Sequence, residues 1–156
     1  PTHRLLPPTS TILKTIKYEA EMGSRMRKLN CSMNGNMLER IASRGVLNSP
    51  WGLDIAPKGF GQFAGDLLVG NFGDGTIDAF DPRHGKFLGQ LLGGDGNPLQ
   101  IQDLWALTNG TGSSGTDPNA VYFTAGGQDE QHGLFGSLSV ASDQSHPTLS
   151  VLSMHT

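Results

Sequence analysis

A mainly β chain of antiparallel, four-stranded sheets is the fold that this sequence predicts. Short apolar runs alternate with turn residues, glycine is abundant at 22 of 156 residues, and one tryptophan-led pattern occurs twice. A four-stranded unit that recurs after about 50 residues is typical of the blades of a β-propeller. Two such blades cannot close a ring, since propellers need at least about four. We therefore expect an incomplete ring with open sheet edges, preceded by a short N-terminal helix or arm.

Residues 1–34 differ in character from the rest of the chain and form the first expected region. Pro7 and Pro8 exclude a helix at the very start. After Ser10, a residue suited to capping a helix, Thr11–Arg27 carries apolar residues at roughly helical spacing together with several basic residues. Either an amphipathic helix or a loosely ordered arm fits this pattern, and such a run of charge is typical of a solvated face.

The partial propeller is expected over residues 35–156. Met37–Ser43 predicts an outer strand that stands apart from the two repeats. Residues 47–92 form the first expected blade, in which Asp74-Gly75 marks a hairpin because tight two-residue turns need positive φ. The four expected strands of this blade are Trp51–Ala56, Leu67–Phe72, Thr76–Phe80 and Lys86–Leu92.

Residues 103–152 repeat this plan as the second expected blade. Trp51-Gly52-Leu53 is matched by Trp105-Ala106-Leu107, 54 positions later (105 − 51). The next apolar run follows 16 positions after each tryptophan (67 − 51 and 121 − 105). Alternation along the first strand places Trp51, Leu53 and Ile55 on one face. The later strands of the second blade are expected at Val121–Phe123, Gly133–Val140 and Thr148–Leu152.

Charge and composition exclude several classes of partner. The formal net charge is −3 and 16% of the residues are charged, without the clustered basic face that binds nucleic acid. No apolar run approaches the roughly 18 residues of a membrane span. Cys31 is the single cysteine, which excludes an internal disulfide and a cysteine-based metal cluster.

Two glycine-rich loops imitate dinucleotide-binding fingerprints. Gly59–Ala64 fits G-x-G-x-x-A and Gly110–Gly115 fits G-x-G-x-x-G. Such a loop binds pyrophosphate only where it opens a helix. A strand-like run follows the first loop and Thr116-Asp117-Pro118 follows the second, so nucleotide binding is not expected. Asn30 and Asn109 open glycosylation sequons, which are used only in a eukaryotic secretory pathway.

The loops around the central channel are where a propeller offers its binding surface, and five polar residues are expected to be exposed there. They are Asn71, Asp74, Asp129, Glu130 and His132. Asp129–His132 is also the densest group of side chains able to bind a metal ion. No second histidine-containing segment completes a metal site, so a solvated hairpin tip is the favoured interpretation.

Three further carboxylates are close in sequence. Asp74, Asp78 and Asp81 could approach one Ca²⁺, but their spacing does not match the calcium-binding loop D-x-[DN]-x-[DN]-G. We expect them instead to set turn geometry by accepting hydrogen bonds from nearby backbone N–H groups. No serine elbow of the G-x-S-x-G type and no Ser/His/Asp set is evident. No cofactor is therefore assigned, and Ca²⁺ stays an alternative.

The strings LNSPWGLDIAP, GDLLVGNFGDGTIDAFDP, GKFLGQL, LWALTNG and VYFTAGGQDEQHGLFGSL together resemble a known group of proteins. It is an uncharacterised family of exported, NHL-like propeller proteins, found largely in bacteria, some of which end in a PEP-CTERM sorting tag. The resemblance covers roughly residues 35–140 and implies a six-bladed propeller of which this chain holds the closing blades. It implies no activity. Residues 1–34 and the tail after Ala141 depart from the family.

We expect from all this a non-catalytic binding or scaffold module, secreted or periplasmic, with a protein or carbohydrate partner. The chain begins at Pro1 without a signal segment, which indicates a fragment or a processed product. Open blade edges predict self-association. Two alternatives stay open: a Ca²⁺-dependent lactonase or esterase, by analogy with other six-bladed propellers, and a nonfunctional gene fragment.

Overall fold

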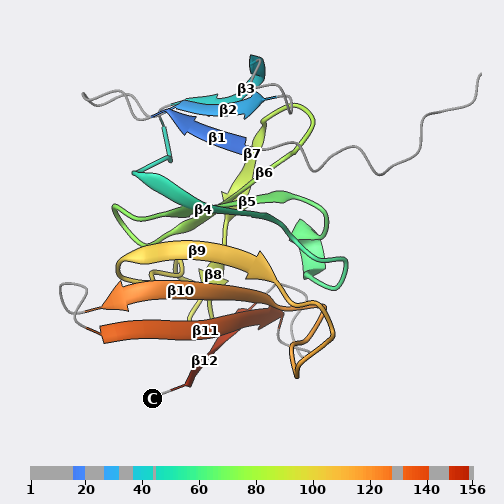
Figure 1. The fold of residues 1–156 in the computed structure, drawn as a ribbon, viewed down its shortest axis with the longest axis vertical. Helices are drawn as coiled ribbons and strands as arrows, with labels where there is room; N and C mark the ends of the chain where they lie inside the picture. Colours follow the sequence, from blue (N-terminus) through green and yellow to red (C-terminus); the bar gives the residue numbers. More distant parts are fainter. Residues whose placement is uncertain are drawn as a thin grey trace, which may run out of the picture.

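The computed structural model describes the backbone of residues 16–19, 27–31, 37–43, 45–127, 132–140 and 148–154, and the side chains of residues 45–126 and 133–140. The described strands form three β-sheets that follow one another along the long axis of the molecule (Figure 1). In the described ranges the other regular element is one short 3-10 turn, η1 (Gly61–Phe63), and no α-helix is present. The expected mainly β, antiparallel fold is confirmed.

The first sheet lies in the N-terminal part of the chain and has the order β1-β2-β3. Its strands are β1 (Ile16–Glu19), β2 (Arg27–Cys31) and β3 (Met37–Ser43). The helix alternative for Thr11–Arg27 is wrong where this segment is described, since Ile16–Glu19 is a strand. Ile16 and Tyr18 alternate with charged residues there, and β-branched and aromatic residues such as these two favour strands. The strand expected at Met37–Ser43 is confirmed, but it pairs with β2 rather than standing apart.

The second sheet is the first expected blade. It is an antiparallel meander of β4 (Pro50–Ile55), β5 (Leu67–Asn71), β6 (Ile77–Phe80) and β7 (Phe87–Gln90), in that order across the sheet. All four expected strands are present. Each strand begins and ends within two residues of its expected limits.

The hairpin between β5 and β6 is confirmed, but its turn is longer than expected. The Asn71 N–H donates to the Thr76 carbonyl at 2.8 Å and the Gly75 N–H donates to the Asn71 carbonyl at 2.9 Å, which encloses a four-residue loop. Gly75, at φ 73°, is the one residue of this loop with positive φ. The loop between β6 and β7 has the same design and ends at Gly85, at φ 65°. An Asp-Gly pair therefore marked the position of the hairpin but not its loop length.

The third sheet is the second expected blade with one added strand. Its order is β8-β12-β11-β10-β9, from β8 (Leu92–Gly93), β9 (Leu104–Asn109), β10 (Val121–Gly127), β11 (His132–Val140) and β12 (Thr148–Met154). The four-stranded meander β9 to β12 is confirmed. Strand β8, which the sequence did not reveal, pairs in parallel with β12 and ties the chain leaving the second sheet to the far edge of the third.

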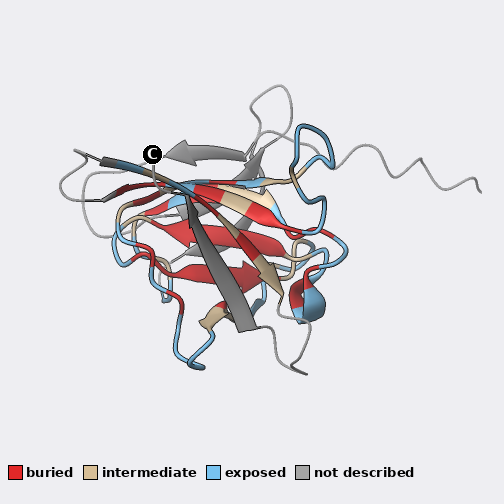
Figure 2. Ribbon diagram, turned by 90° about the horizontal axis from the view of Figure 1, so that it is seen from below, coloured by how far each residue is buried: buried red, intermediate tan, exposed pale blue. Residues whose placement is uncertain are grey.

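The second and third sheets pack face to face, with β4 lying against β9 (Figure 1). The main core fills the space between them, and Figure 2 shows buried residues along the stacked strands and exposed residues in the surrounding loops. Its buried members are Ala56, Phe60, Phe63, Leu68, Ile77, Ala79, Leu91, Leu99, Ile101, Leu104, Leu107, Val121, Phe123, Ala125 and Leu138. The first strands of successive meanders meet in this way in adjacent propeller blades, although the described sheets do not close a ring.

A second, smaller core lies on the opposite face of the second sheet. Leu67, Val69 and Phe80 are buried there, with Leu47 and Leu53 packed against them. Successive residues of β5 thus point alternately to the two cores, as strand geometry requires. Figure 1 places the first sheet on this side, so the second sheet is the middle layer of three.

Glycine at position 52 allows β4 and β9 to approach closely. A Cβ atom on Gly52 would lie 3.0 Å from the Leu107 nitrogen and 3.1 Å from the Trp105 oxygen, both in the backbone of β9. Backbone atoms cannot swing aside as the end of a flexible side chain can. The contact between the two blades therefore depends on the absence of a side chain at this position.

Candidate functional site

Both tryptophan-bearing strands, β4 and β9, follow a residue in the left-handed region of φ. Ser49 has φ 50° and Asp103 has φ 53°, and these positions are 54 apart (103 − 49). The Ser49 carbonyl accepts the Phe72 N–H at 2.9 Å, and the Asp103 carbonyl accepts the Gly126 N–H at 2.9 Å, again 54 positions on (126 − 72). The two blades are thus structural copies even in strained backbone, and such strain is most common at functional sites.

Three aromatic side chains gather where these strands begin. Trp51 and Trp105 meet edge to face with ring centroids 5.1 Å apart, and Phe72 lies 5.5 Å from Trp105 and 6.2 Å from Trp51. Trp51 is 54% exposed, whereas Phe72 and Trp105 are partly buried. We call Trp51, Phe72 and Trp105 the aromatic rim. The rings support one another, and most of the exposed aromatic surface belongs to Trp51.

Backbone hydrogen bonds join the three loops that adjoin the aromatic rim. Besides the bond from Phe72 to Ser49, the Gly73 N–H donates to the Asn48 carbonyl at 3.1 Å. The Ile101 N–H donates to the Gly75 carbonyl at 2.9 Å, which connects the Phe72 loop to the segment that leads into β9. The rim is therefore held in place before any ligand arrives.

A polar pair lies in the same loops. The Asn48 Nδ2 donates to Asp74 Oδ2 at 3.2 Å, and the Asn48 side chain occupies the space that a Cβ on Gly73 would need. Asp74 Oδ1 accepts the backbone N–H of Thr76 at 3.0 Å and its hydroxyl at 2.7 Å. Asp74 is exposed, as expected. Its Oδ2, with this one bond from Asn48, has a further lone pair for a ligand hydroxyl or amine.

Asn71 was expected to be exposed, and the structure corrects this, since the side chain is fully buried. Its Nδ2 donates to Thr76 Oγ1 at 3.0 Å and to Asp78 Oδ2 at 2.9 Å. Its Oδ1 accepts the backbone N–H of Asn48 at 3.0 Å. Asn71 is buried because every one of these partners lies inside the hairpin or in the loop that crosses it. It supports the rim and is not positioned to touch a ligand.

Asp78 is likewise fully buried, and its Oδ1 accepts the Gln90 Nε2 at 3.0 Å. Burial raises the pKa of Asp78, the hydrogen bonds from Asn71 and Gln90 oppose this rise, and the charge of Asp74 adds to it. Within the described residues, no three His, Cys, Asp or Glu side chains gather as a metal site would require.

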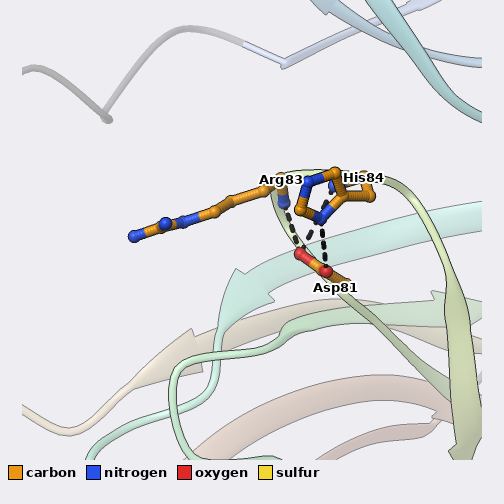
Figure 3. A network of polar contacts seen from close by, with 3 residues as sticks. All are labelled: Asp81, Arg83 and His84. Atoms are coloured by element: carbon orange, nitrogen blue, oxygen red, sulfur yellow. Dashed lines mark hydrogen bonds and ion pairs between the residues drawn. The ribbon is translucent and has the colours of Figure 1, made fainter.

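Asp81 closes the turn between β6 and β7, as expected for an aspartate that sets turn geometry. Its Oδ1 accepts the backbone N–H groups of Arg83 at 2.7 Å and His84 at 3.3 Å, and its Oδ2 lies 2.8 Å from His84 Nδ1 (Figure 3). The hydrogen bond from the His84 ring, with those from the two backbone groups, lowers the pKa of Asp81. This exposed network is local to its turn.

The remaining predicted site residues stay predictions. Asp129 and Glu130 lie outside the described residues, and His132 opens β11 with its side chain outside them. No helix in the described part of the chain is long and apolar enough to cross a membrane.

Neither glycine-rich loop opens an α-helix. Gly59–Ala64 contains η1 and leads directly into β5. In the second loop, Thr111, Ser113 and Thr116 bond to one another through hydroxyl groups. Beside it, Asn109 Nδ2, the atom that a glycan at this sequon would modify, donates to the Ile55 carbonyl at 2.7 Å and so joins the two blades.

The sequence interpretation missed the aromatic rim. It placed Trp51 on one face of a strand with Leu53 and Ile55, which is wrong for Trp51: the pairing of β4 with β5 shifts register between Pro50 and Gly52, and the Trp51 ring contacts Trp105 of β9 while Leu53 packs in the smaller core on the other face. Alternation assigns residues to faces only where the strand pairing is regular, and an extra residue at a bulge changes the face of its neighbour. The recurrence of tryptophan 54 positions later (105 − 51) was the available signal.

Comparison with known proteins gives relatives without an assigned activity. No protein-family profile matches the chain. Uncharacterized proteins L690 and R648 of Acanthamoeba polyphaga mimivirus are each 40% identical to it over 107 residues, or 69% of this chain. The matches cover 27% and 26% of those proteins, so the chain spans about a quarter of the length of the curated relatives it matches. The names of these viral proteins refer to neither an NHL-like repeat nor a sorting tag.

Among solved structures, the chain is similar to the PQQ-bound form of an aldose sugar dehydrogenase from Streptomyces coelicolor. The TM-score is 0.43 at 19% sequence identity, over 69% of this chain and 30% of that one.

Proposed function

We propose that the chain is a non-catalytic binding module of a propeller-type protein, and that the aromatic rim with Asn48 and Asp74 is its ligand-facing surface. The observation that carries the proposal is Trp51, which is 54% exposed yet fixed by two neighbouring rings. Large aromatic side chains held in place at a surface supply binding energy at low entropic cost. An exposed apolar cluster rimmed by polar groups is typical of an interaction site.

The carboxylates nearest to the rim support binding rather than chemistry. Asp74 Oδ1 is occupied by Thr76, and both oxygens of Asp78 are occupied by amides within a buried network. A general base needs access to the proton that it removes. Buried Asp78 has no such access, and Asp74 acts in turn geometry.

The resemblance noted above supports a location outside the cytoplasm and an NHL-like parent propeller. Expressing the chain from its own gene as a reporter fusion and fractionating the cells tests that location. Recovery of the reporter in the cytoplasm would contradict the proposed location.

The binding role is tested with three forms of the protein: wild type, Trp51→Ala and Phe87→Ala. Phe87 is 41% exposed and lies on β7, at the edge of the second sheet opposite β4, so its variant is a matched aromatic control. Each is screened against peptide and glycan arrays. We expect ligands that bind wild type and the Phe87 variant and are lost with the Trp51 variant.

The hydrolase alternative is tested in parallel with Ca²⁺, Mn²⁺ and Zn²⁺ in thermal-shift assays and with a panel of esters and lactones. Metal-dependent turnover that survives Trp51→Ala would replace the binding role by catalysis. Ligands that bind the Trp51 variant as well as wild type would move the binding surface away from the rim.

A further inference from the structure

We propose that the aromatic rim binds a neutral carbohydrate, with the C–H face of one pyranose ring stacked on Trp51 and its hydroxyl groups bonded to Asn48 and Asp74. This inference rests on the proposed binding role and names its ligand class. It follows from the shape of the rim, its polar neighbours and its charge.

The shape of the rim favours a flat platform over a cage. Trp51, Phe72 and Trp105 lie 5.1 to 6.2 Å apart and pack against each other, so they do not surround an empty space that could hold a cationic group. Most of the exposed surface instead belongs to a single residue, Trp51, which is 54% exposed. The negative π-face of an indole attracts the positively polarised C–H groups of a sugar ring.

The polar neighbours match hydroxyl groups. Asn48 offers both a donor and an acceptor, and Asp74 Oδ2 has a lone pair beyond its 3.2 Å bond with Asn48. Both side chains are exposed, and the Asn48 side chain lies against Gly73, in the space that a Cβ atom there would fill. A sugar hydroxyl can donate to the carboxylate while accepting from the amide, which a purely apolar ligand cannot do.

The charge of the rim argues against the other planar ligands. The loop segments 45–49, 72–75 and 100–103 contain no lysine or arginine and include Asp74 and Asp103. A stacked nucleobase brings phosphates that need basic residues alongside the aromatic ring. A protein partner needs roughly 800 Å² of contact on each side, which is far more than one exposed indole offers. A neutral ring compound with hydroxyl groups needs neither basic residues nor a large contact area.

The test titrates the full chain with cellohexaose, chitohexaose and mannohexaose, monitored by tryptophan fluorescence and calorimetry. We expect at least one sugar to bind wild type with a Kd in the millimolar range or tighter. Trp51→Ala should raise that Kd by about tenfold or more, and Trp51→Phe, which keeps an aromatic platform, should raise it by less than about threefold. Asn48→Ala should weaken binding several-fold with the rings intact, and Phe87→Ala should leave it unchanged.

Because Trp51 and Asn48 are exposed, we expect each variant to fold. A thermal melt of each variant checks this. If no sugar binds, or if Trp51→Ala leaves the Kd unaltered, the carbohydrate assignment is overturned. In that case, peptides or quaternary ammonium compounds that bind wild type and not the Trp51 variant would preserve the binding role with another ligand. If these compounds do not bind either, both the carbohydrate assignment and the binding role of the aromatic rim are overturned.

Discussion

Asp78 carries a carboxylate with no exposed surface, and each of its oxygens accepts one amide N–H group. Because burial disfavours the charged form, the pKa of Asp78 is raised in the folded protein, against the opposing effect of the two amides. The folded state therefore holds a proton more tightly than the unfolded state does. Its contribution to the free energy of unfolding is greatest at low pH and falls as pH rises from the ordinary aspartate value through the raised one.

Replacing the carboxyl group of Asp78 tests the direction of this pH dependence. Asp78→Asn keeps an oxygen for Asn71 and lets Gln90 rotate its own amide to accept from the new N–H₂ group. The free energy of unfolding of the variant relative to wild type should increase as pH rises from the ordinary aspartate pKa through the raised one, and then level off. Urea unfolding at a series of pH values measures it. A difference that does not vary with pH would show that Asp78 has its ordinary pKa.

Asn71 is predicted to contribute to stability rather than to direct ligand contact. Asn71→Ala leaves Asp78 Oδ2 and the Asn48 N–H without their partners, and an unsatisfied buried polar group costs about 1–3 kcal/mol. Urea unfolding at neutral pH should show a loss of this size. Asn97→Ala is the control, since the exposed Asn97 side chain donates to Asp95 in its own turn and its removal should change stability by less than about 0.5 kcal/mol.

At the scale of the strand, the contact between β4 and β9 depends on Gly52. Gly52→Ala places a methyl group about 3.0 Å from the β9 backbone, which must shift to accommodate it. We expect a loss of roughly 1–3 kcal/mol, as for other overpacked interiors, measured by thermal or urea unfolding. Gly133→Ala on β11 is the matched control, because its Cβ would meet nothing within 4 Å. Equal effects at both positions would mean that the two strands are not in close contact.

The strands were predictable because each depends on local pattern. Apolar alternation and turn residues located β4 to β7 and β9 to β12, and the tryptophan repeat identified the two blades as copies. What escaped prediction depends on partners far along the chain. Strand β8 is two residues long and exists because β12 lies beside it, more than 50 positions later (148 − 92). Asn71 is buried because Asn48, 23 positions away, covers it.

The candidate site was predictable only in part, for the same reason. Asp74 is exposed next to the rim, as its place in a glycine-rich turn indicates. Trp51 belongs to a strand, where an aromatic residue is usually read as core. Its exposure follows from the stacking of two sheets, which leaves the start of β4 uncovered. That arrangement is a property of the pair of blades and not of either strand.

At the scale of the whole molecule, the outer face of the third sheet corresponds, in the repeat, to the face of the second sheet that is buried against the third. Leu68 and Gly70 of β5 are covered by the third sheet, and the residues 54 positions later are Tyr122 and Thr124 of β10. Thr124 is exposed, and Phe135, its partner on β11, is 44% exposed and stacks on Tyr122 with centroids 5.6 Å apart. The same position that receives a neighbouring blade in one repeat presents aromatic surface to water in the other.

Burying this face would remove apolar surface from water, so we expect the chain to self-associate through it. Ser137 and Thr124 make the face partly polar, which favours association in the micromolar range or weaker, about −8 kcal/mol or less in magnitude. Phe135→Lys should weaken the association by tenfold or more, about 1.4 kcal/mol, in sedimentation equilibrium. Leu88→Lys, on the exposed edge strand β7, separates face-to-face from edge-to-edge pairing, because only the latter buries Leu88. If Leu88→Lys alone abolishes the association, the open edge and not the repeated face joins the copies.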